Sequence, residues 1–177
     1  MSTPAADPSP LPDILAQNLK VVFCGINPGL HSASVGHHFA HPSNRFWRTL
    51  HLSGFTPHQL EPTQDRSLPQ YGLGLTNIVE RPSAAAAELS TGELIQGRTR
   101  LIEKIESFMP LFLAILGLGA YRKAFEQPHS KVGQQPQLLG RARVWLLPNP
   151  SGLNAHYSIN DLSNLFQELR RSVTDNT

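Results

Sequence analysis

Four short runs of predominantly apolar residues constrain the fold of this chain more than any other feature. They cover residues 19–24, 73–79, 111–116 and 144–147, and turn residues follow them. Strands that are apolar at every position are buried on both faces, which is typical of parallel sheets covered by helices. The runs therefore predict the strands of a buried, mainly parallel sheet.

Helical patterns separate these runs. Each places apolar residues three or four positions apart, so that one face of the helix is apolar. Two of the predicted helices cover 42–52 and 161–173. A third begins at the Ser90–Glu93 capping box and ends before Pro110. A short fourth helix passes through Tyr121 and Phe125. A polar loop is expected over 127–137. Strands that alternate with helices predict a three-layer α/β sandwich with a central, mainly parallel sheet and helices on both faces.

The composition fits a single folded domain. The chain has 177 residues, of which 40% are hydrophobic, which is enough for a substantial core. Prolines among small polar residues predict a disordered tail over 1–12, which leaves one domain over 13–177. The formal net charge of +2 excludes a polycation that binds DNA through bulk charge alone.

The chain has one cysteine, Cys24, which excludes an intramolecular disulfide and a cysteine zinc site. It lies within an apolar run and is expected to be an inert core thiol. No run approaches the roughly 18 apolar residues that span a bilayer, and the N-terminus lacks the pattern of a signal peptide. We therefore expect a cytoplasmic protein with no membrane partner.

Two loops of turn residues follow the first and fourth apolar runs. They read G-I-N-P-G over 25–29 and P-N-P-S-G-L over 148–153. The carboxyl ends of parallel strands meet at one edge of the sheet, where ligands bind. The first loop lacks the spacing of a dinucleotide fingerprint, and Pro28 removes an amide that a phosphate cradle would use. Each loop alone is also compatible with an ordinary turn, but their shared edge predicts a functional site.

Taken together, these motifs point to a known family. The matching segments are V-V-F-C-G-I-N-P-G-L over 21–30, F-A-H-P over 39–42, N-R-F-W over 44–47 and L-P-N-P-S-G-L over 147–153. R-P at 81–82 and L-I-E-K-I over 101–105 lie between them. The chain resembles the mismatch-specific uracil DNA glycosylases, bacterial relatives of thymine DNA glycosylase in the uracil-DNA glycosylase superfamily, over roughly residues 13–169.

This resemblance implies a DNA repair enzyme with the uracil-DNA glycosylase fold. Such an enzyme flips uracil out of a mismatch with guanine and hydrolyses the N-glycosidic bond, which leaves an abasic site. Thymine and exocyclic cytosine adducts are further candidate substrates. The expected partner is double-stranded DNA with a G·U or related mismatch. The protein is expected to act as a monomer without a cofactor or metal.

The resemblance also assigns roles around the first motif. Asn27 matches the position that holds the attacking water, which an amide can orient but cannot deprotonate. Backbone amides around Ile26 and Phe39 are the expected donors to the departing base anion, and Phe39 matches the aromatic residue that stacks on the flipped base. Glu88 is an auxiliary catalytic candidate, although a glutamate there also favours a helix N-terminus. The predicted base pocket comprises Gly25, Ile26, Pro28, Gly29, Ser32, Phe39 and Asn77.

The second motif is predicted to enter the DNA. Gly152 and Leu153 form the wedge that fills the vacated stack, and Ala155 stands where relatives often have an arginine. The full predicted set is Asn149, Pro150, Ser151, Gly152, Leu153, Asn154 and Ala155. In the base pocket, Ser32 is predicted to limit room at the C5 methyl of thymine, so that Ser32→Ala should raise the thymine-to-uracil rate ratio.

Other interpretations remain open on the sequence. A catalytically weak protein of the same fold could bind mismatches or abasic sites, because an amide replaces a carboxylate at position 27. A nucleotide-binding α/β domain is disfavoured by the missing phosphate-loop glycines. His37, His38 and His41 lack the spacing of a metal site and are expected to be loop residues near the DNA backbone. No lysine lies in the two loops, so a monofunctional enzyme without a Schiff-base step is expected.

Overall fold

A computed structural model of the chain describes residues 11–177. Its centre is a five-stranded sheet with the strand order β2-β1-β3-β5-β4. The strands are β1 (Val21–Gly25), β2 (Leu73–Asn77), β3 (Phe112–Leu116), β4 (Gly133–Leu139) and β5 (Ala142–Leu147). All neighbours pair in parallel except β4, which is antiparallel to β5. The mainly parallel sheet predicted from the apolar runs is confirmed.

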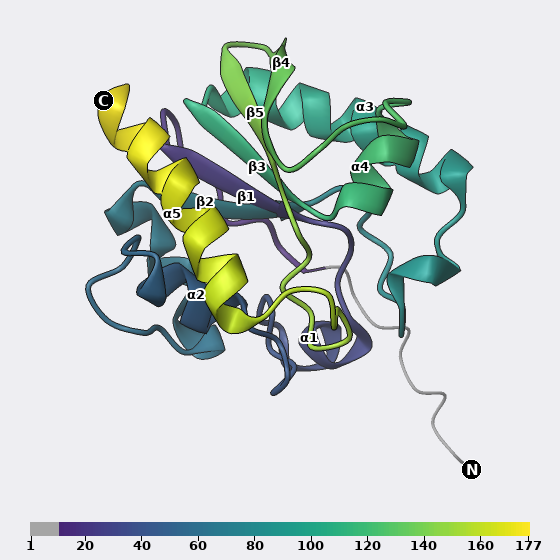
Figure 1. Cartoon of the computed structure of the whole chain (residues 1–177). Coiled ribbons are helices and arrows are strands. Elements are labelled where there is room, and N and C mark those ends of the chain that lie inside the picture. Colours follow the sequence, from purple (N-terminus) through teal and green to yellow (C-terminus); the bar gives the residue numbers. More distant parts are fainter. Residues whose placement is uncertain (1–10) are drawn as a thin grey trace.

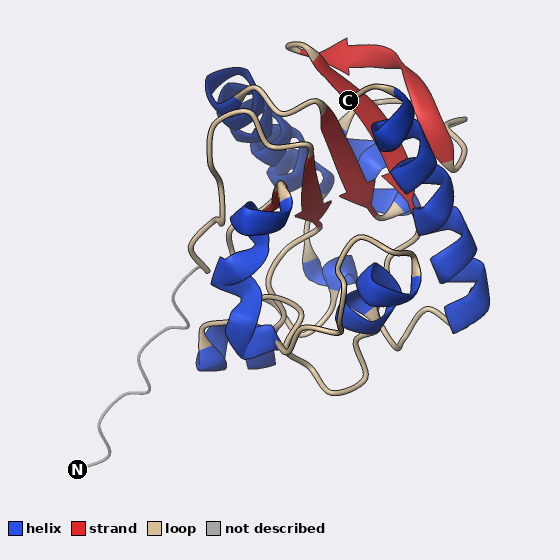
Figure 2. Cartoon of the chain, turned by 90° about the vertical axis from the view of Figure 1, so that its left-hand side faces the viewer, coloured by secondary structure: helices blue, strands red, loops and turns tan. Residues whose placement is uncertain are grey.

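Helices cover both faces of this sheet, so the predicted three-layer sandwich is also confirmed (Figure 1). One face carries α2 (Phe46–Leu52), the 3₁₀ helix η1 (Pro62–Tyr71) and α5 (Ile159–Asp175). The other carries α3 (Thr91–Phe108) and α4 (Leu118–Ala124). Two shorter elements are α1 (Leu30–Val35), which follows β1, and the 3₁₀ helix η2 (Ala86–Glu88), which precedes α3. Figure 2 shows the strands between the helical layers.

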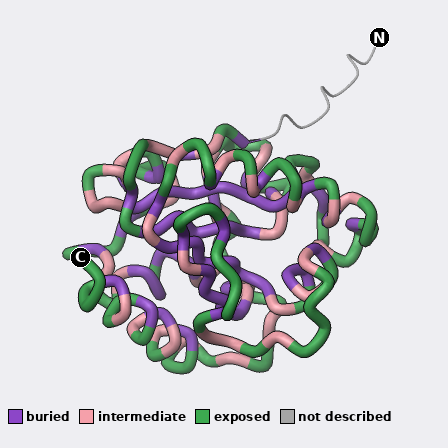
Figure 3. Tube along the Cα trace, turned by 90° about the horizontal axis from the view of Figure 1, so that it is seen from above, coloured by how far each residue is buried: buried purple, intermediate pink, exposed green. Residues whose placement is uncertain are grey.

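The core divides into two apolar clusters, one on each face of the sheet. Val21 and Phe23 of β1 belong to the cluster under α2 and α5, whereas Val22 and Cys24 belong to the cluster under α3 and α4. This follows from the two-residue period of a strand. Burial of each large apolar side chain stabilises the fold by about 1.5–3 kcal/mol. Figure 3 shows the buried strands running through the middle of the molecule.

Three local differences from the sequence-based expectations have physical causes. The helix expected over 42–52 begins only at Phe46, because Asn44 Oδ1 accepts a hydrogen bond from the Phe46 amide and holds residues 41–44 in a turn. The expected polar loop contains β4, an edge strand whose register shifts around Pro136. No helix is predicted at the position of α1, because six residues are too few to show a helical apolar pattern.

The predicted disordered tail, residues 1–12, lies outside the described residues except for its last two. Leu11 is buried, and the Pro12 carbonyl accepts a hydrogen bond from His38 Nε2. These two residues pack against the folded domain. Within residues 11–177, none of the helices combines the length and the apolar character that a membrane span requires.

Candidate functional site

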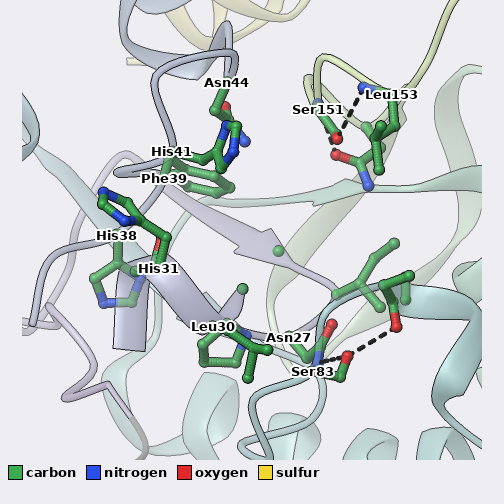
Figure 4. A pocket seen from close by; sticks show the side chains of 18 of the residues that line it. Asn27, Leu30, His31, His38, Phe39, His41, Asn44, Ser83, Ser151 and Leu153 are labelled. Atoms are coloured by element: carbon green, nitrogen blue, oxygen red, sulfur yellow. Dashed lines mark hydrogen bonds between the residues drawn. The ribbon is translucent and has the colours of Figure 1, made fainter. Parts of the chain in front are cut away.

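A cavity of about 640 Å³ opens where the parallel strands end. This size is in the usual range for small-molecule sites. Its walls come from the loops after β1, β2 and β5, so both loops singled out in the sequence contribute to one site. Figure 4 shows side chains from these loops facing the same space. Of the predicted base pocket, the lining includes Gly25, Ile26, Pro28, Gly29, Ser32, Phe39 and Asn77.

The amide of Asn27 is held in one orientation by two hydrogen bonds. Its Nδ2 donates to the Arg81 carbonyl and to Ser83 Oγ, both at 2.8 Å. Ser83 Oγ donates in turn to the Ala85 carbonyl at 2.8 Å, so this hydroxyl accepts from Asn27. A carbonyl can only accept, which places the nitrogen of Asn27 toward Arg81. The oxygen Oδ1 is therefore left as the acceptor that Asn27 offers to the cavity.

The segment that holds Asn27 is itself anchored. Ser83 pairs with Gly29 in an isolated parallel bridge, and its amide donates to the Pro28 carbonyl at 3.1 Å. The Arg81 guanidinium contacts the Glu93 carboxylate at 2.7 Å. The hydrogen bond from Arg81 lowers the pKa of Glu93 to about 2. The carboxylate also accepts from the Ser90 amide, so the predicted capping box at the start of α3 is part of this anchor.

Phe39 is fixed at the cavity by packing and by a strained backbone. Its φ of 52° lies in the left-handed region, which a bulky residue rarely adopts. Its ring stacks on Phe46 with centroids 4.2 Å apart. The buried Ser32 Oγ accepts a hydrogen bond from the next amide, that of Ala40, at 3.0 Å. Ser32 therefore shapes the turn that presents Phe39, besides lining the cavity.

Gly25 and Asn77 are paired across β1 and β2 at the floor of the cavity. A Cβ atom at Gly25 would lie 2.5 Å from Asn77 Oδ1, so only glycine leaves room for this amide. Asn77 is 8% exposed, and its side chain makes no hydrogen bond to residues 11–177. Asn77 therefore offers unused hydrogen-bonding groups to whatever fills the cavity.

The loop after β5 is rigid and carries one exposed leucine at the mouth of the cavity. Ser151 Oγ accepts from the Leu153 amide at 3.2 Å, and Asn154 Nδ2 donates to the Asn149 carbonyl at 3.1 Å. Leu153 is 84% exposed. The internal hydrogen bonds of this loop thus present a large apolar side chain to solvent. We call residues 149–157 the wedge loop.

Three predicted site residues lie outside the cavity lining. Glu88 is exposed, and its carboxylate accepts a hydrogen bond from the Ala85 amide at 3.2 Å, as a residue that caps a helix does. Within the wedge loop, Pro150 is buried and Ala155 is exposed. Of the predicted catalytic pair, the structure brings only Asn27 into the cavity.

The expectation that the three loop histidines lie near the DNA backbone is wrong for His38. It is 3% exposed, and its Nε2 donates to the Pro12 carbonyl at 2.8 Å. Burial lowers the pKa of His38 and favours the neutral ring, although the buried Asp65 nearby opposes this effect. His37 contacts the same carboxylate at 3.2 Å. Among the residues that the structure describes, no three His, Cys, Asp or Glu side chains are grouped as a metal site requires.

Sequence reasoning assigned no role to Ser83, which lines the cavity, or to Arg45, which contacts the wedge loop. A signal for Ser83 was present, because polar residues that follow β2 must reach the same edge as those that follow its neighbour β1. Arg45 lies in the N-R-F-W segment that carries the resemblance, but no local pattern indicates its contacts, because its partners lie more than 100 residues along the chain.

Comparisons with known proteins show the family and the fold of the chain. A family model described as the uracil DNA glycosylase superfamily matches residues 12–172. Among solved structures, the chain is similar to the solution NMR structure of a candidate uracil DNA glycosylase from Methanosarcina acetivorans. The two are 20% identical with a TM-score of 0.56, over 94% of this chain and 98% of the other. At this identity, the structural match supports the fold, and the family model carries the relationship.

Proposed function

The chain belongs to the uracil DNA glycosylase superfamily, and from this premise we propose that it removes uracil from G·U mismatches in duplex DNA. The base is extruded into the cavity, and water hydrolyses its N-glycosidic bond to leave an abasic site. The observation that carries this proposal is the fixed amide of Asn27, whose Oδ1 faces a cavity that also contains Phe39 and the amide of Asn77, which has no hydrogen-bond partner within residues 11–177.

Asn27 orients the attacking water in this mechanism. Both N–H groups of its amide are occupied by Arg81 and Ser83, so Oδ1 accepts a hydrogen bond from the water and points a lone pair of the water at the sugar carbon. The amide takes no proton from the water. As the water bonds to the sugar carbon, the electron pair of the N-glycosidic bond leaves with the base, and the base anion takes up the proton that the water loses. The reaction therefore depends on a leaving group that departs as an anion and on a sugar that carries positive charge in the transition state.

The cavity stabilises the departing base. Phe39 stacks on the ring, and Asn77 forms hydrogen bonds with its polar edge. The backbone amides of Ile26 and Phe39 donate to no other residue in the described part of the chain, so they are free to stabilise the anion. Donors that are fixed before the reaction stabilise developing charge most effectively in a site that excludes water.

Leu153 fills the space that the extruded nucleotide leaves in the stack. Extrusion costs a few kcal/mol, and less for a mismatched base. This difference favours a G·U wobble pair before any contact with the base is made. The wedge loop is the surface that then meets the unpaired guanine.

The enzyme is monofunctional in this proposal. A glycosylase that also cleaves the strand uses an amine to form a Schiff base with the sugar. Among the described residues, the lining of the cavity includes no lysine. Water is therefore the proposed nucleophile, and the abasic strand remains intact.

Single-turnover incubation with labelled duplexes followed by alkali tests this function. The panel compares G·U, A·U and G·T duplexes with single-stranded uracil DNA. We expect alkali-dependent scission that is fastest for G·U and no scission before alkali. Tight binding to G·U without any abasic product would instead identify a mismatch-binding protein. Equal rates for G·U and A·U would contradict the mismatch preference.

A further inference from the structure

The guanidinium of Arg45 forms hydrogen bonds with four carbonyls of the wedge loop. Nε donates to Pro150 at 3.3 Å, Nη1 donates to Tyr157, and Nη2 donates to Ser151 and Asn154 at 3.0 Å each. The Arg45 backbone amide adds a hydrogen bond to the Pro150 carbonyl at 3.0 Å. One side chain therefore contacts the beginning, the middle and the end of this loop.

The two carbonyls that share Nη2 lie on either side of the exposed tip. Ser151 precedes and Asn154 follows Gly152 and Leu153, and the Asn154 amide donates to the Ser151 carbonyl at 3.0 Å to close the turn. The Arg45 nitrogen binds the carbonyls at both ends of this turn and fixes it to the segment that carries Arg45. Gly152 packs against the same segment that carries Arg45. A Cβ atom at Gly152 would lie 2.7 Å from Ser43 Cβ and from the Ser43 carbonyl oxygen. The tip is therefore supported from behind by Ser43 and Arg45.

Only an arginine fits this arrangement. Guanidinium donates through five N–H groups in a rigid, planar fork, whereas the lysine ammonium is a point charge with three rotatable donors. Within residues 11–177, no carboxylate forms a salt bridge with Arg45. Its contacts are thus with backbone oxygens whose positions define the loop, and not with another charged side chain.

We propose that Arg45 is the positioning residue of the wedge loop, which holds Leu153 ready to enter the DNA stack. This inference rests on the proposed glycosylase function and adds a residue to it. A loop that is already ordered loses little conformational entropy on insertion. Without the fork, Leu153 would sample other positions and extrude the base less often.

The test measures base unstacking separately from excision. A duplex with 2-aminopurine beside the mismatched uracil reports unstacking by its fluorescence, and alkaline cleavage of the same samples reports excision. The variants are Arg45→Lys, Leu153→Ala and the double variant. Arg48→Lys is the matched control, because Arg48 is an exposed arginine of α2. Melting temperatures establish that each variant is folded.

We expect wild type and Arg48→Lys to give the same fluorescence rise. Arg45→Lys and Leu153→Ala should each reduce the equilibrium for unstacking about tenfold or more, because the apolar wedge is no longer held in place or is absent. Because Arg45 acts through Leu153, the double variant should be no worse than Leu153→Ala alone. The inference would be overturned if the loss of unstacking in the double variant equalled the product of the two single losses. It would also be overturned if Arg45→Lys gave the same fluorescence rise as wild type.

Two further results keep the inference distinct from the proposed function. If wild type shows the fluorescence rise but gives no alkali-labile product, the glycosylase function is contradicted and the role of Arg45 is still tested. If wild type shows no fluorescence rise, both the glycosylase function and the role of Arg45 are overturned. If Arg45→Lys does not fold, Gly152→Ala displaces the tip from Ser43 while it retains the arginine. We expect the same loss of unstacking from Gly152→Ala, and wild-type unstacking by this folded variant would overturn the inference.

Discussion

The side-chain nitrogen of Asn27 lies 2.8 Å from the hydroxyl oxygen of Ser83, which is 5% exposed. This contact joins the loop after β1 to the segment after β2, and together with the hydrogen bond to the Arg81 carbonyl it determines which end of the amide faces the cavity. A free asparagine could present either its nitrogen or its oxygen to a water molecule. With Ser83 in place, Asn27 presents its oxygen.

Ser83→Ala should slow excision without preventing folding. The change removes one hydrogen bond, worth about 0.5–1.5 kcal/mol, which corresponds to about 2- to 13-fold in rate. Ser83→Thr retains the hydroxyl and should keep most of the activity. Single-turnover rates on a G·U duplex measure both variants. A wild-type rate for Ser83→Ala would show that Asn27 does not depend on this contact.

Gly25→Ala should impair the base pocket, whereas Gly29→Ala should be tolerated. A Cβ atom at Gly25 would lie 2.5 Å from Asn77 Oδ1, but one at Gly29 would have no neighbour within 4 Å. Gly29 also has a φ of −69°, which alanine adopts readily. The two variants differ by four positions in the same loop, so each controls for the other.

The measurement for this pair is the single-turnover rate together with the melting temperature. We expect Gly25→Ala to lose at least about tenfold in rate, because the displaced Asn77 amide no longer meets the base. Gly29→Ala should excise at close to the wild-type rate. Equal activity of the two variants would mean that the amide of Asn77 does not determine the fit of the base.

His38 should make the stability of the protein depend on pH below neutrality. Burial lowers its pKa below the usual 6.5 despite the nearby Asp65. Between the folded and unfolded pKa values, the unfolded chain binds more protons at this ring. The free energy of unfolding therefore rises with pH across this window, and this stability is lost as the pH falls below about 6.5.

Denaturant unfolding between pH 5 and 7.5 tests this prediction. His38→Gln keeps a side-chain N–H that can donate to the Pro12 carbonyl but does not titrate, so its unfolding free energy should decline less steeply toward pH 5 than that of wild type. His129→Gln is the control, because His129 is exposed in the loop before β4. Parallel declines for wild type and His38→Gln would contradict a buried, neutral His38.

The parts of the fold that the sequence predicts are those that bury apolar side chains locally. The run around Phe23 is apolar at every position because both faces of β1 are covered, and the Ser90–Glu93 box marks the start of α3 by spacing alone. By contrast, β4 is rich in glutamine, contains Pro136 and lies at an edge of the sheet. Its pairing depends on backbone hydrogen bonds, which produce no apolar pattern in the sequence.

The same distinction applies to the candidate site. The loops that contain Asn27 and Leu153 could be placed together because parallel strands end at one edge. Their supports could not be identified from local patterns. Ser83 lies 56 residues from Asn27, and Arg45 lies 106 residues from the Ser151 carbonyl that it holds. Glu88 shows the opposite case, because a plausible acid by sequence caps η2 outside the cavity.

The most direct test of the account compares Asn27→Ala and Glu88→Gln with wild type in single-turnover excision from a G·U duplex. Wild type should produce alkali-labile sites, Asn27→Ala should be slower by about 100-fold or more because the water is no longer oriented, and Glu88→Gln should remain near the wild-type rate. A greater loss for Glu88→Gln than for Asn27→Ala would contradict the assignment of the water to Asn27.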